Sequence, residues 1–247
     1  MQSPDYSGPS AMADMMVIGE RYSRILAPSL SRLNIRPIWL PNNKLVDDRL
    51  AGHADLSLFY PGGDRIWLAP CFKDSNFARQ LEGMSFQISY PDIRQESSYP
   101  NDAQLNISLC GKWAICRLDN VPDEIAKILT SEFQIINCRQ GYAKCSVCVV
   151  SDSAIITADR GIEAAVRRES DLDVLLISPG FIELAGFDYG FIGGASFKIS
   201  SDKLAFTGRL DGHKNKTEIL DFLKKHNVEP VYLTERPVFD IGSAIPV

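Results

Sequence analysis

Short apolar runs of β-prone residues come in pairs along the chain, and each pair is split by a short polar turn. The four pairs occupy residues 55–69, 104–117, 144–157 and 195–207. Runs of this length on either side of a glycine- or serine-containing turn are typical of β-hairpins. The sequence therefore predicts four hairpins, with turn centres near Gly62, Gly111, Asp152 and Ser201.

A helical pattern and one further strand follow each hairpin. The predicted helices cover residues 74–83, 120–133, 160–169 and 217–227, and the strands after them cover residues 85–90, 134–138, 173–178 and 228–233. Apolar residues in these helices recur on one face, as for Ile125, Ile128 and Leu129. The repeated unit is thus β-β-α-β, and successive turns are 49, 41 and 49 residues apart.

The two ends of the chain together supply a fifth unit. Residues 14–19 predict its second strand, residues 28–33 a short helix and residues 35–40 its third strand, while residues 238–246 predict the missing first strand. Pairing of residues 238–244 with residues 15–19 would close a ring and remove exposed sheet edges. We therefore expect an α/β fold, a five-fold pseudosymmetric α/β propeller closed by its terminal strands. An α+β sandwich with coincidental spacing is the alternative.

The composition is that of a globular protein, with 45% hydrophobic and 23% charged residues in 247. Residues 1–11, which are rich in serine and proline, are expected to be a mobile tail. Residues 12–247 would then form a single domain.

Charge and cysteine content narrow the class of protein. The formal net charge is −5, with no basic stripe, which argues against a nucleic-acid partner. No apolar run approaches the roughly 18 residues of a membrane span, so no membrane partner is expected. A secretion signal is not recognisable and there are only six cysteines, so we expect a cytoplasmic protein with reduced thiols; its oligomeric state is open.

The starts of the first hairpin strands carry the candidate chemistry. They read Gly52-His53-Ala-Asp55, Gly141-Tyr-Ala-Lys-Cys145-Ser146, Gly190-Phe-Ile-Gly-Gly-Ala195 and Phe239-Asp240-Ile-Gly-Ser243. Residues two apart in a strand share a face, so His53 and Asp55 are expected to point the same way.

These segments resemble those of the pentein fold, the α/β propeller of guanidino-group-modifying enzymes (GMEs), which include arginine deiminases, dimethylargininases, agmatine deiminases and amidinotransferases. His53-x-Asp55 is similar to the family's His-x-Asp signature, and Gly141-x-x-x-Cys145 is similar to the segment that bears the nucleophilic cysteine. The cysteine unit follows the histidine unit by two, as in the enzymes, although their cysteine lies near the C-terminus. Lys144 and Val147 replace the usual histidine and threonine. The chain thus resembles an uncharacterised bacterial branch of this fold.

The resemblance implies a cysteine-dependent hydrolase or amidinotransferase that acts on a small guanidino or amidino compound in an axial pocket. Cys145 would be the nucleophile, His53 would protonate the leaving amine and activate water, and Asp55 would orient the imidazole or bind substrate. The substrate-binding candidates are Asp240, which would hold the guanidinium, and Asp188, Gly193, Gly194 and Ser243. Thiol chemistry needs neither a metal nor an organic cofactor, so none is expected.

Each candidate residue also has a purely structural interpretation. Cys145 would be a small buried apolar residue, His53 a loop residue that caps a strand, and Asp240 a turn carboxylate. A pentein of this kind would act as a small-ligand sensor or bind a macromolecular partner, since the fold is also used by a ribosome anti-association factor without catalysis. A nucleophilic Cys145 is expected to have a depressed pKa and to be the most reactive of the six thiols.

Three other patterns are assigned no catalytic chemistry. Cys145-x-x-Cys148 would place its sulfur atoms on opposite faces of a strand, which argues against a metal or redox pair. The glycines of residues 190–195 precede a strand, whereas phosphate-binding glycine loops lead into a helix. His213 and His226 lie at the ends of a polar helix, where exposure to solvent is expected.

Overall fold

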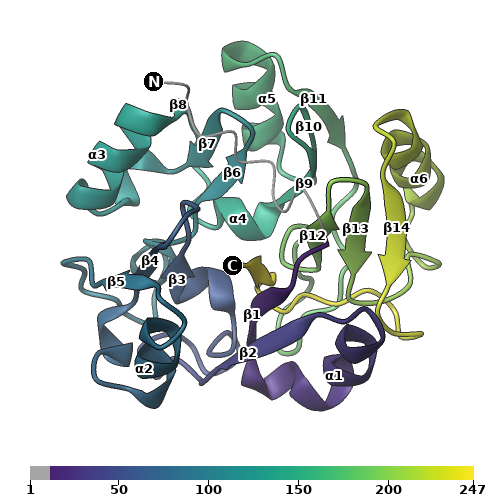
Figure 1. The fold of residues 1–247 in the computed structure, drawn as a ribbon. Helices are drawn as coiled ribbons and strands as arrows, with labels where there is room; N and C mark the ends of the chain where they lie inside the picture. Colours follow the sequence, from purple (N-terminus) through teal and green to yellow (C-terminus); the bar gives the residue numbers. More distant parts are fainter. Residues whose placement is uncertain (1–11) are drawn as a thin grey trace.

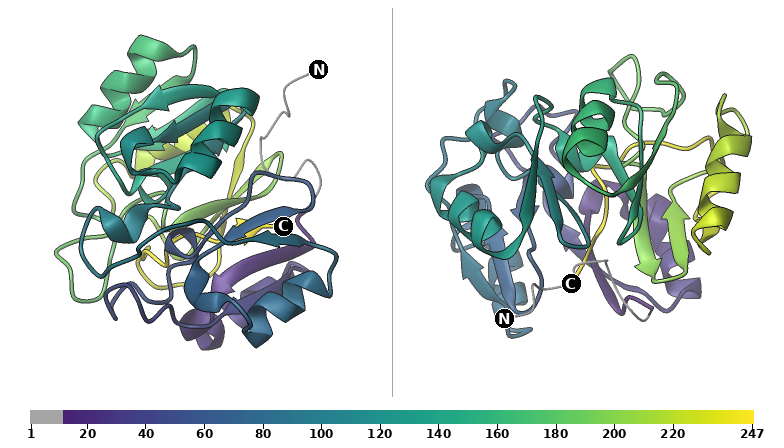
Figure 2. Two further views of the ribbon diagram at one scale, coloured as in Figure 1. Left: turned by 90° about the vertical axis from the view of Figure 1, so that its left-hand side faces the viewer. Right: turned by 90° about the horizontal axis from the view of Figure 1, so that it is seen from above.

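The computed structural model of the protein describes residues 12–247, and the predicted tail of residues 1–11 lies outside the described residues. Five three-stranded sheets are arranged around a common centre, and the longer helices lie outside them (Figure 1). Seen from above, the yellow helix α6 (Lys216–Lys225) forms one outer edge of the molecule (Figure 2). The fold is therefore α/β with five small sheets, and within residues 12–247 these sheets do not join into one continuous closed sheet.

Four sheets repeat one topology, an antiparallel hairpin whose second strand pairs in parallel with a third strand that follows a helix. The predicted β-β-α-β repeat is thus confirmed. The elements in chain order are β3 (Leu58–Phe59), β4 (Arg65–Leu68), α2 (Asn76–Glu82) and β5 (Gln87–Ser89); β6 (Ser108–Cys110), β7 (Trp113–Cys116), α3 (Asp123–Glu132) and β8 (Gln134–Asn137); β9 (Val147–Ser151), β10 (Ala154–Thr157), α5 (Arg160–Glu169) and β11 (Asp173–Leu176); and β12 (Ser196–Ser200), β13 (Lys203–Phe206), α6 and β14 (Glu229–Tyr232).

The two ends of the chain meet in the fifth sheet. It contains β1 (Met15–Gly19), which precedes α1 (Ser23–Arg32), with β2 (Arg36–Leu40) on one side and β15 (Ile245–Pro246) on the other. Val17 faces Ile245 in the antiparallel pair of β1 and β15. The expected meeting of the termini is therefore confirmed, but the strand from the C-terminal end is only two residues long.

Residues 238–244 do not form the predicted strand with β1. Gly242 and Ser243 have φ angles of +69° and +63°, a left-handed conformation that is incompatible with a strand. The segment instead crosses to the chain before β12, where the Ile241 and Ser243 amides donate to the Gly194 carbonyl at 3.0 and 2.9 Å. This path carries Asp240 toward the centre of the molecule.

Local sequence explains the helices well. Asp159 caps α5 by accepting hydrogen bonds from the backbone amides of Gly161 and Ile162, and Ile162, Ala165 and Val166 form its buried face.

None of the helices in residues 12–247 has the length and apolar character needed to cross a membrane.

Candidate active site

Two of the predicted strand starts are turns in the structure. Ala54–Leu56 form a single 3-10 turn before β3, and Ala143–Ser146 form the short helix α4 before β9. The expectation that His53 and Asp55 share a strand face was therefore wrong, and so was the strand argument for Cys145 and Cys148. Both turns face the centre of the molecule, where α4 is visible in Figure 1.

His53, Asp55 and Cys145 come together at this centre, although they belong to different units. Their nitrogen, oxygen and sulfur ligand atoms all lie within 4.8 Å of one another. The Cys145 thiol donates a hydrogen bond of 2.9 Å to Asp55 Oδ2. All three residues are buried, so the cluster is largely shielded from water.

Asn106 holds the cysteine segment in place, and the sequence analysis did not single it out. Its Oδ1 accepts hydrogen bonds from the backbone amides of Lys144 and Cys145 at 2.6 and 3.2 Å. Its Nδ2 lies 3.2 Å from the Asp55 carbonyl and 3.3 Å from the Cys145 sulfur. The only signal in the sequence is an asparagine just before β6, in the unit between those of His53 and Cys145.

Asp240 is fixed by backbone donors and closely surrounded by glycines. Its Oδ2 accepts from the Phe191 amide and its Oδ1 from the Gly242 amide, both at 2.8 Å. A Cβ atom at Gly194 would lie 2.0 Å from Asp240 Oδ1, and one at Gly190 would lie 2.5 Å from the Asp240 Cβ. These glycines therefore make room for the carboxylate.

Gly193 and Gly242 allow two further close approaches. A Cβ atom at Gly193 would lie 2.4 Å from the carbonyl oxygens of Lys144 and Val147, so this glycine lets the chain pack against α4. A Cβ atom at Gly242 would lie 2.2 Å from the His53 Cβ. Ser243 is fully buried beside Gly242.

A pocket of about 260 Å³ opens above the cluster. His53, Cys145 and Asp240 line it, and Asp188 contributes from an exposed loop. The other predicted residues do not line it, because Asp55 lies behind Cys145 and Gly193, Gly194 and Ser243 lie in the supporting backbone. The rest of the wall is apolar or aromatic and consists of Leu50, Leu56, Tyr142, Leu184, Phe187, Tyr189 and Phe191.

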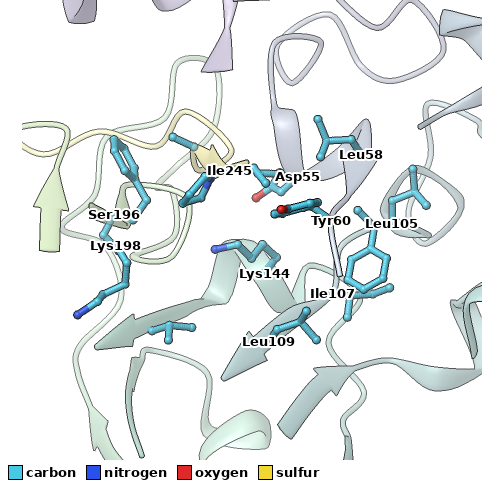
Figure 3. A pocket seen from close by; sticks show the side chains of 15 residues that line it. Asp55, Leu58, Tyr60, Leu105, Ile107, Leu109, Lys144, Ser196, Lys198 and Ile245 are labelled. Carbon is cyan, nitrogen blue, oxygen red and sulfur yellow. The ribbon is translucent and has the colours of Figure 1, made fainter. Parts of the chain in front are cut away.

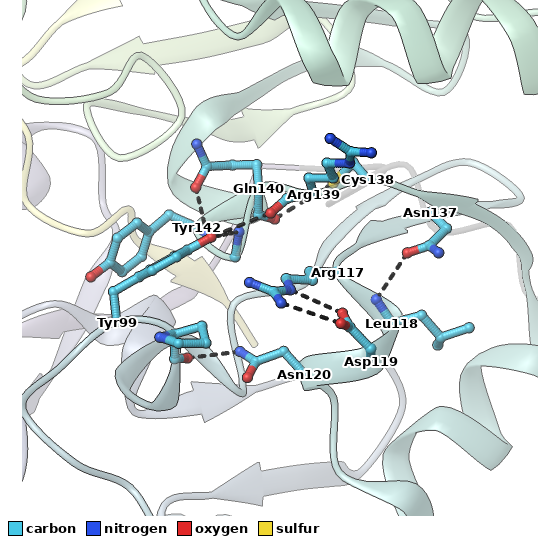
Figure 4. A network of polar contacts seen from close by, with 12 residues as sticks. Tyr99, Arg117, Leu118, Asp119, Asn120, Asn137, Cys138, Arg139, Gln140 and Tyr142 are labelled. Carbon is cyan, nitrogen blue, oxygen red and sulfur yellow. Dashed lines mark hydrogen bonds and ion pairs between the residues drawn. The ribbon is translucent and has the colours of Figure 1, made fainter.

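The turn that leads to Cys145 is anchored by a polar network (Figure 4). The Gly141 amide donates to the Tyr99 hydroxyl at 3.0 Å, and the Tyr142 amide donates to Gln140 Oε1 at 3.1 Å. The Tyr142 ring packs between Tyr99 and Phe191, with ring centroids 5.3 and 6.2 Å away. This anchoring fixes one wall of the pocket.

Burial controls the protonation of the cluster. It raises the pKa of Cys145 well above its usual value, and the carboxylates of Asp55 and Asp240 raise it further. Burial raises the pKa of Asp55 to about 6 and that of Asp240 to about 7, and burial together with the Arg21 charge lowers the pKa of His53 to about 3. The expected depressed pKa of Cys145 is therefore wrong for the unliganded protein, since its thiol is neutral at pH 7.

Two polar atoms in the cluster have no protein partner. His53 Nε2 and Asp55 Oδ1 are buried, and neither makes a hydrogen bond within residues 12–247. Buried polar atoms are normally paired, so these two indicate a place for a ligand or water. His53, Asp55 and Cys145 could also coordinate a transition metal, whereas Cys148 does not belong to this group of ligands.

The remaining cysteines and histidines lie elsewhere. All six cysteines are free, and only Cys71 is exposed. His213 is buried and packs on Phe181 at 5.2 Å between ring centroids, while His226 Nε2 lies 2.8 Å from Asp173 Oδ2. The expectation that both histidines face solvent was therefore wrong, because each one packs against a neighbouring element.

Several solved structures that superpose on this chain are guanidino-modifying enzymes. Inosamine-phosphate amidinotransferase from Streptomyces griseus superposes with a TM-score of 0.56 at 12% identity, covering 100% of this chain and 97% of its own. A citrulline complex of a DDAH variant from Pseudomonas aeruginosa gives 0.54 at 9% identity, covering 96% and 100%. Agmatine deiminase from C. jejuni gives 0.53 at 10% identity, covering 92% and 89%. The protein therefore has the pentein fold.

The chain belongs to a family of unknown function (DUF6873), whose sequence profile matches residues 17–245. The comparison with curated proteins found no match. The family assignment thus agrees with the expected uncharacterised branch of the guanidino-modifying fold.

Proposed function

We propose that this protein is a cysteine-dependent enzyme, of the hydrolase or amidinotransferase type, that acts on a guanidino or amidino compound. The observation that carries the proposal is the meeting of Cys145, His53 and Asp55 below a pocket that Asp240 also lines. The names of the structural neighbours support it, since they are an amidinotransferase, an agmatine deiminase and DDAH with citrulline.

The substrate itself supplies the charge that activates the thiol. A guanidinium group next to Asp240 brings a positive charge toward Cys145, and such a charge within about 4–6 Å lowers a pKa by about 1–3 units. The hydrogen bond from Cys145 to Asp55 Oδ2 gives the departing proton an acceptor. The resting thiol is thereby kept unreactive until a cation fills the pocket.

The thiolate then attacks the guanidino or amidino carbon and forms a tetrahedral adduct. The proton that Cys145 gave to Asp55 passes to the leaving amine through His53, whose low pKa makes it a ready proton donor once it is charged. Expulsion of the amine leaves the remaining group bound to sulfur. Water, deprotonated by His53, or an acceptor amine then attacks the same carbon. The carbon–sulfur bond breaks, Cys145 leaves as thiolate, and the hydrolysed or transferred product is released.

The pocket walls favour a substrate whose guanidino group is attached to an apolar or aromatic body. Four aromatic residues line the pocket, while no arginine or lysine does. An α-carboxylate would therefore lack a cationic partner beside Asp188 and Asp240.

Alkylation with a matched pair of reagents tests the proposal. Chloroacetamidine carries the cation and chloroacetamide is its neutral counterpart. At each cysteine, the alkylation rate with chloroacetamidine is divided by the rate with chloroacetamide. We expect this rate ratio to be about tenfold or more higher at Cys145 than at exposed Cys71, because a cation held at Asp240 lowers the pKa of the Cys145 thiol. Peptide mapping in the presence of EDTA measures both sites in one experiment.

The variant Asp240→Asn should lose this selectivity, while Asp152→Asn, on the turn after β9, should retain it. Equal rate ratios at Cys145 and Cys71 in the wild-type protein would contradict substrate-assisted activation and the enzyme proposal with it.

The raised pKa of the Cys145 thiol favours a second candidate, a sensor that binds a guanidino ligand without turnover. In that case phenylguanidine would slow the labelling of Cys145 by iodoacetamide, but no amine would be released from any guanidino compound. Release of an amine that requires Cys145 would support the enzyme and contradict the sensor.

A further inference from the structure

A second pocket, of about 80 Å³, lies at the centre of the molecule and shares no lining residue with the 260 Å³ pocket above Cys145. Asp55 lines it, and the Asp55–Cys145 hydrogen bond lies between the two pockets. Its walls come from four units and from the C-terminal residues Ala244–Pro246 (Figure 3).

The walls of this second pocket are mainly hydrocarbon. Its apolar lining residues are Leu58, Phe59, Leu105, Ile107, Leu109, Val149, Phe197, Ala244, Ile245 and Pro246. Such a surface accepts a small alkyl group without any polar cost. The charged residues of the lining are Asp55, Lys144 and Lys198.

The two lysines differ in their pairing. Lys198 Nζ donates to the Val150 and Ser201 carbonyls at 2.9 and 2.6 Å, and its ammonium group points away from the pocket in Figure 3. The Lys144 side chain lies among the lining residues. Within residues 12–247 its ammonium group makes no hydrogen bond, and no carboxylate oxygen lies within the 4.0 Å of an ion pair.

An ammonium group that faces hydrocarbon and has no protein acceptor is unfavourable, because its charge and its three N–H donors lack a partner. An anion bound next to Lys144 would supply that partner. The surrounding hydrocarbon would at the same time select an anion with an apolar chain.

We propose that this pocket binds a short-chain carboxylate, with its carboxylate paired to Lys144 and its alkyl chain against Leu58, Ile107 and Leu109. A volume of about 80 Å³ fits a chain of about four carbons, since an engineered apolar cavity of roughly 150 Å³ holds benzene. Inorganic phosphate fits poorly, because it lacks an apolar part and would meet only one unpaired cation.

The measurement is made at pH 5.5, where the ligand must still carry its charge. A simple carboxylate with an ordinary pKa near 4 is still ionised at this pH.

Calorimetric titration at pH 5.5 with butyrate, butyramide, butylammonium and inorganic phosphate tests the proposal on the whole chain. We expect butyrate to bind at least about tenfold more tightly than butyramide, whereas butylammonium and phosphate show no binding. Equal binding of butyrate and butyramide would overturn the ion pair with Lys144. Absence of butyrate binding at 20 mM would overturn the site itself.

Two variants locate the binding. Lys144→Met keeps an apolar side chain of similar length and should remove the preference for butyrate, while Lys127→Met, on the exposed face of α3, should leave it unchanged. Val149→Phe fills the pocket but keeps Lys144, and it should weaken butyrate binding at least about tenfold. Undiminished butyrate binding in both Lys144→Met and Val149→Phe would place it elsewhere and overturn the proposal. All of these measurements report binding and none requires turnover. A negative result would therefore overturn the carboxylate site without contradicting the proposed function.

Discussion

The Cys145 thiol donates a 2.9 Å hydrogen bond to the carboxylate of Asp55, a residue 90 positions away in the sequence. Both groups are buried, and burial together with the Asp55 charge raises the pKa of the thiol. The thiol therefore keeps its proton in this hydrogen-bonded pair near neutral pH.

The first prediction concerns Asp55→Asn. This change removes a negative charge and a hydrogen-bond acceptor that both raise the pKa of Cys145, so the thiol pKa should fall by about one unit or more. Labelling of Cys145 by iodoacetamide at several pH values, followed by peptide mapping, compares the thiolate content of wild type and variant and so reports the direction of the shift. Asp188→Asn changes an exposed carboxylate that lines the 260 Å³ pocket, and it should lower the pKa of Cys145 less. Equal shifts in the two variants would contradict the conclusion that Asp55 raises the pKa of Cys145.

The second prediction concerns Gly242→Ala. Gly242 and Gly63 both have a φ angle of +69°, but a Cβ atom at Gly63 meets nothing within 4 Å, whereas one at Gly242 meets His53 at 2.2 Å. Gly63→Ala should therefore cost about 1 kcal/mol of unfolding free energy from backbone strain alone, and Gly242→Ala more than about 3 kcal/mol. Urea unfolding measures both; similar losses would mean that His53 moves aside easily.

The third prediction concerns pH. The pKa of Asp240 is raised to about 7, so at pH 5.5 its carboxyl is largely neutral and binds a guanidinium weakly. Affinity for phenylguanidine should rise about tenfold or more between pH 5.5 and pH 8, because the guanidinium binds the deprotonated carboxylate and this form increases as the pH passes the pKa of free Asp240. Calorimetry in buffers of different ionisation enthalpy should show proton release on binding near pH 6.5. A pH-independent affinity, or proton uptake, would argue against binding at Asp240.

The fourth prediction concerns the C-terminus. Deletion of residues 245–247 removes β15, exposes one edge of β1 and loses the buried side chain of Ile245. Burial of such a side chain contributes about 1.5–3 kcal/mol, so the melting temperature should fall by about 5 °C or more. Deletion of Val247 alone removes one backbone hydrogen bond, to the Met15 carbonyl, and should lower it much less. Thermal unfolding followed by circular dichroism compares the two, and equal melting temperatures would show that β15 is dispensable.

The repeated unit could be predicted from the local pattern of apolar residues. Apolar residues on one face of each helix and in the short strands indicate which side of each element is buried, so the five β-β-α-β units can be counted from the sequence alone. The predicted helix of residues 160–169 agrees with α5 at both ends, because Asp159 and its capping hydrogen bonds are local. The same reasoning brought the two termini into one unit, since an incomplete unit leaves backbone groups unpaired.

Tertiary structure decided the geometry of the candidate site. The segment of residues 143–146 is a turn of helix rather than a strand because Asn106, from another unit, accepts its backbone hydrogen bonds. The left-handed Gly242 and Ser243 divert residues 238–244 from β1 and carry Asp240 to the glycines of residues 190–194. Such partners are distant in sequence and leave no periodic signal.

The protonation state of the Cys145 thiol also could not be predicted from the sequence. Cys145 could be selected as a candidate from its glycine-led segment, yet its pKa moves upward, opposite to the expectation. The pKa of a buried group depends on lost hydration and on charges brought near by folding, here Asp55 and Asp240. The sequence by itself thus determined the units and the candidate residues, whereas only the packed structure decided how these residues meet and which of them hold a proton.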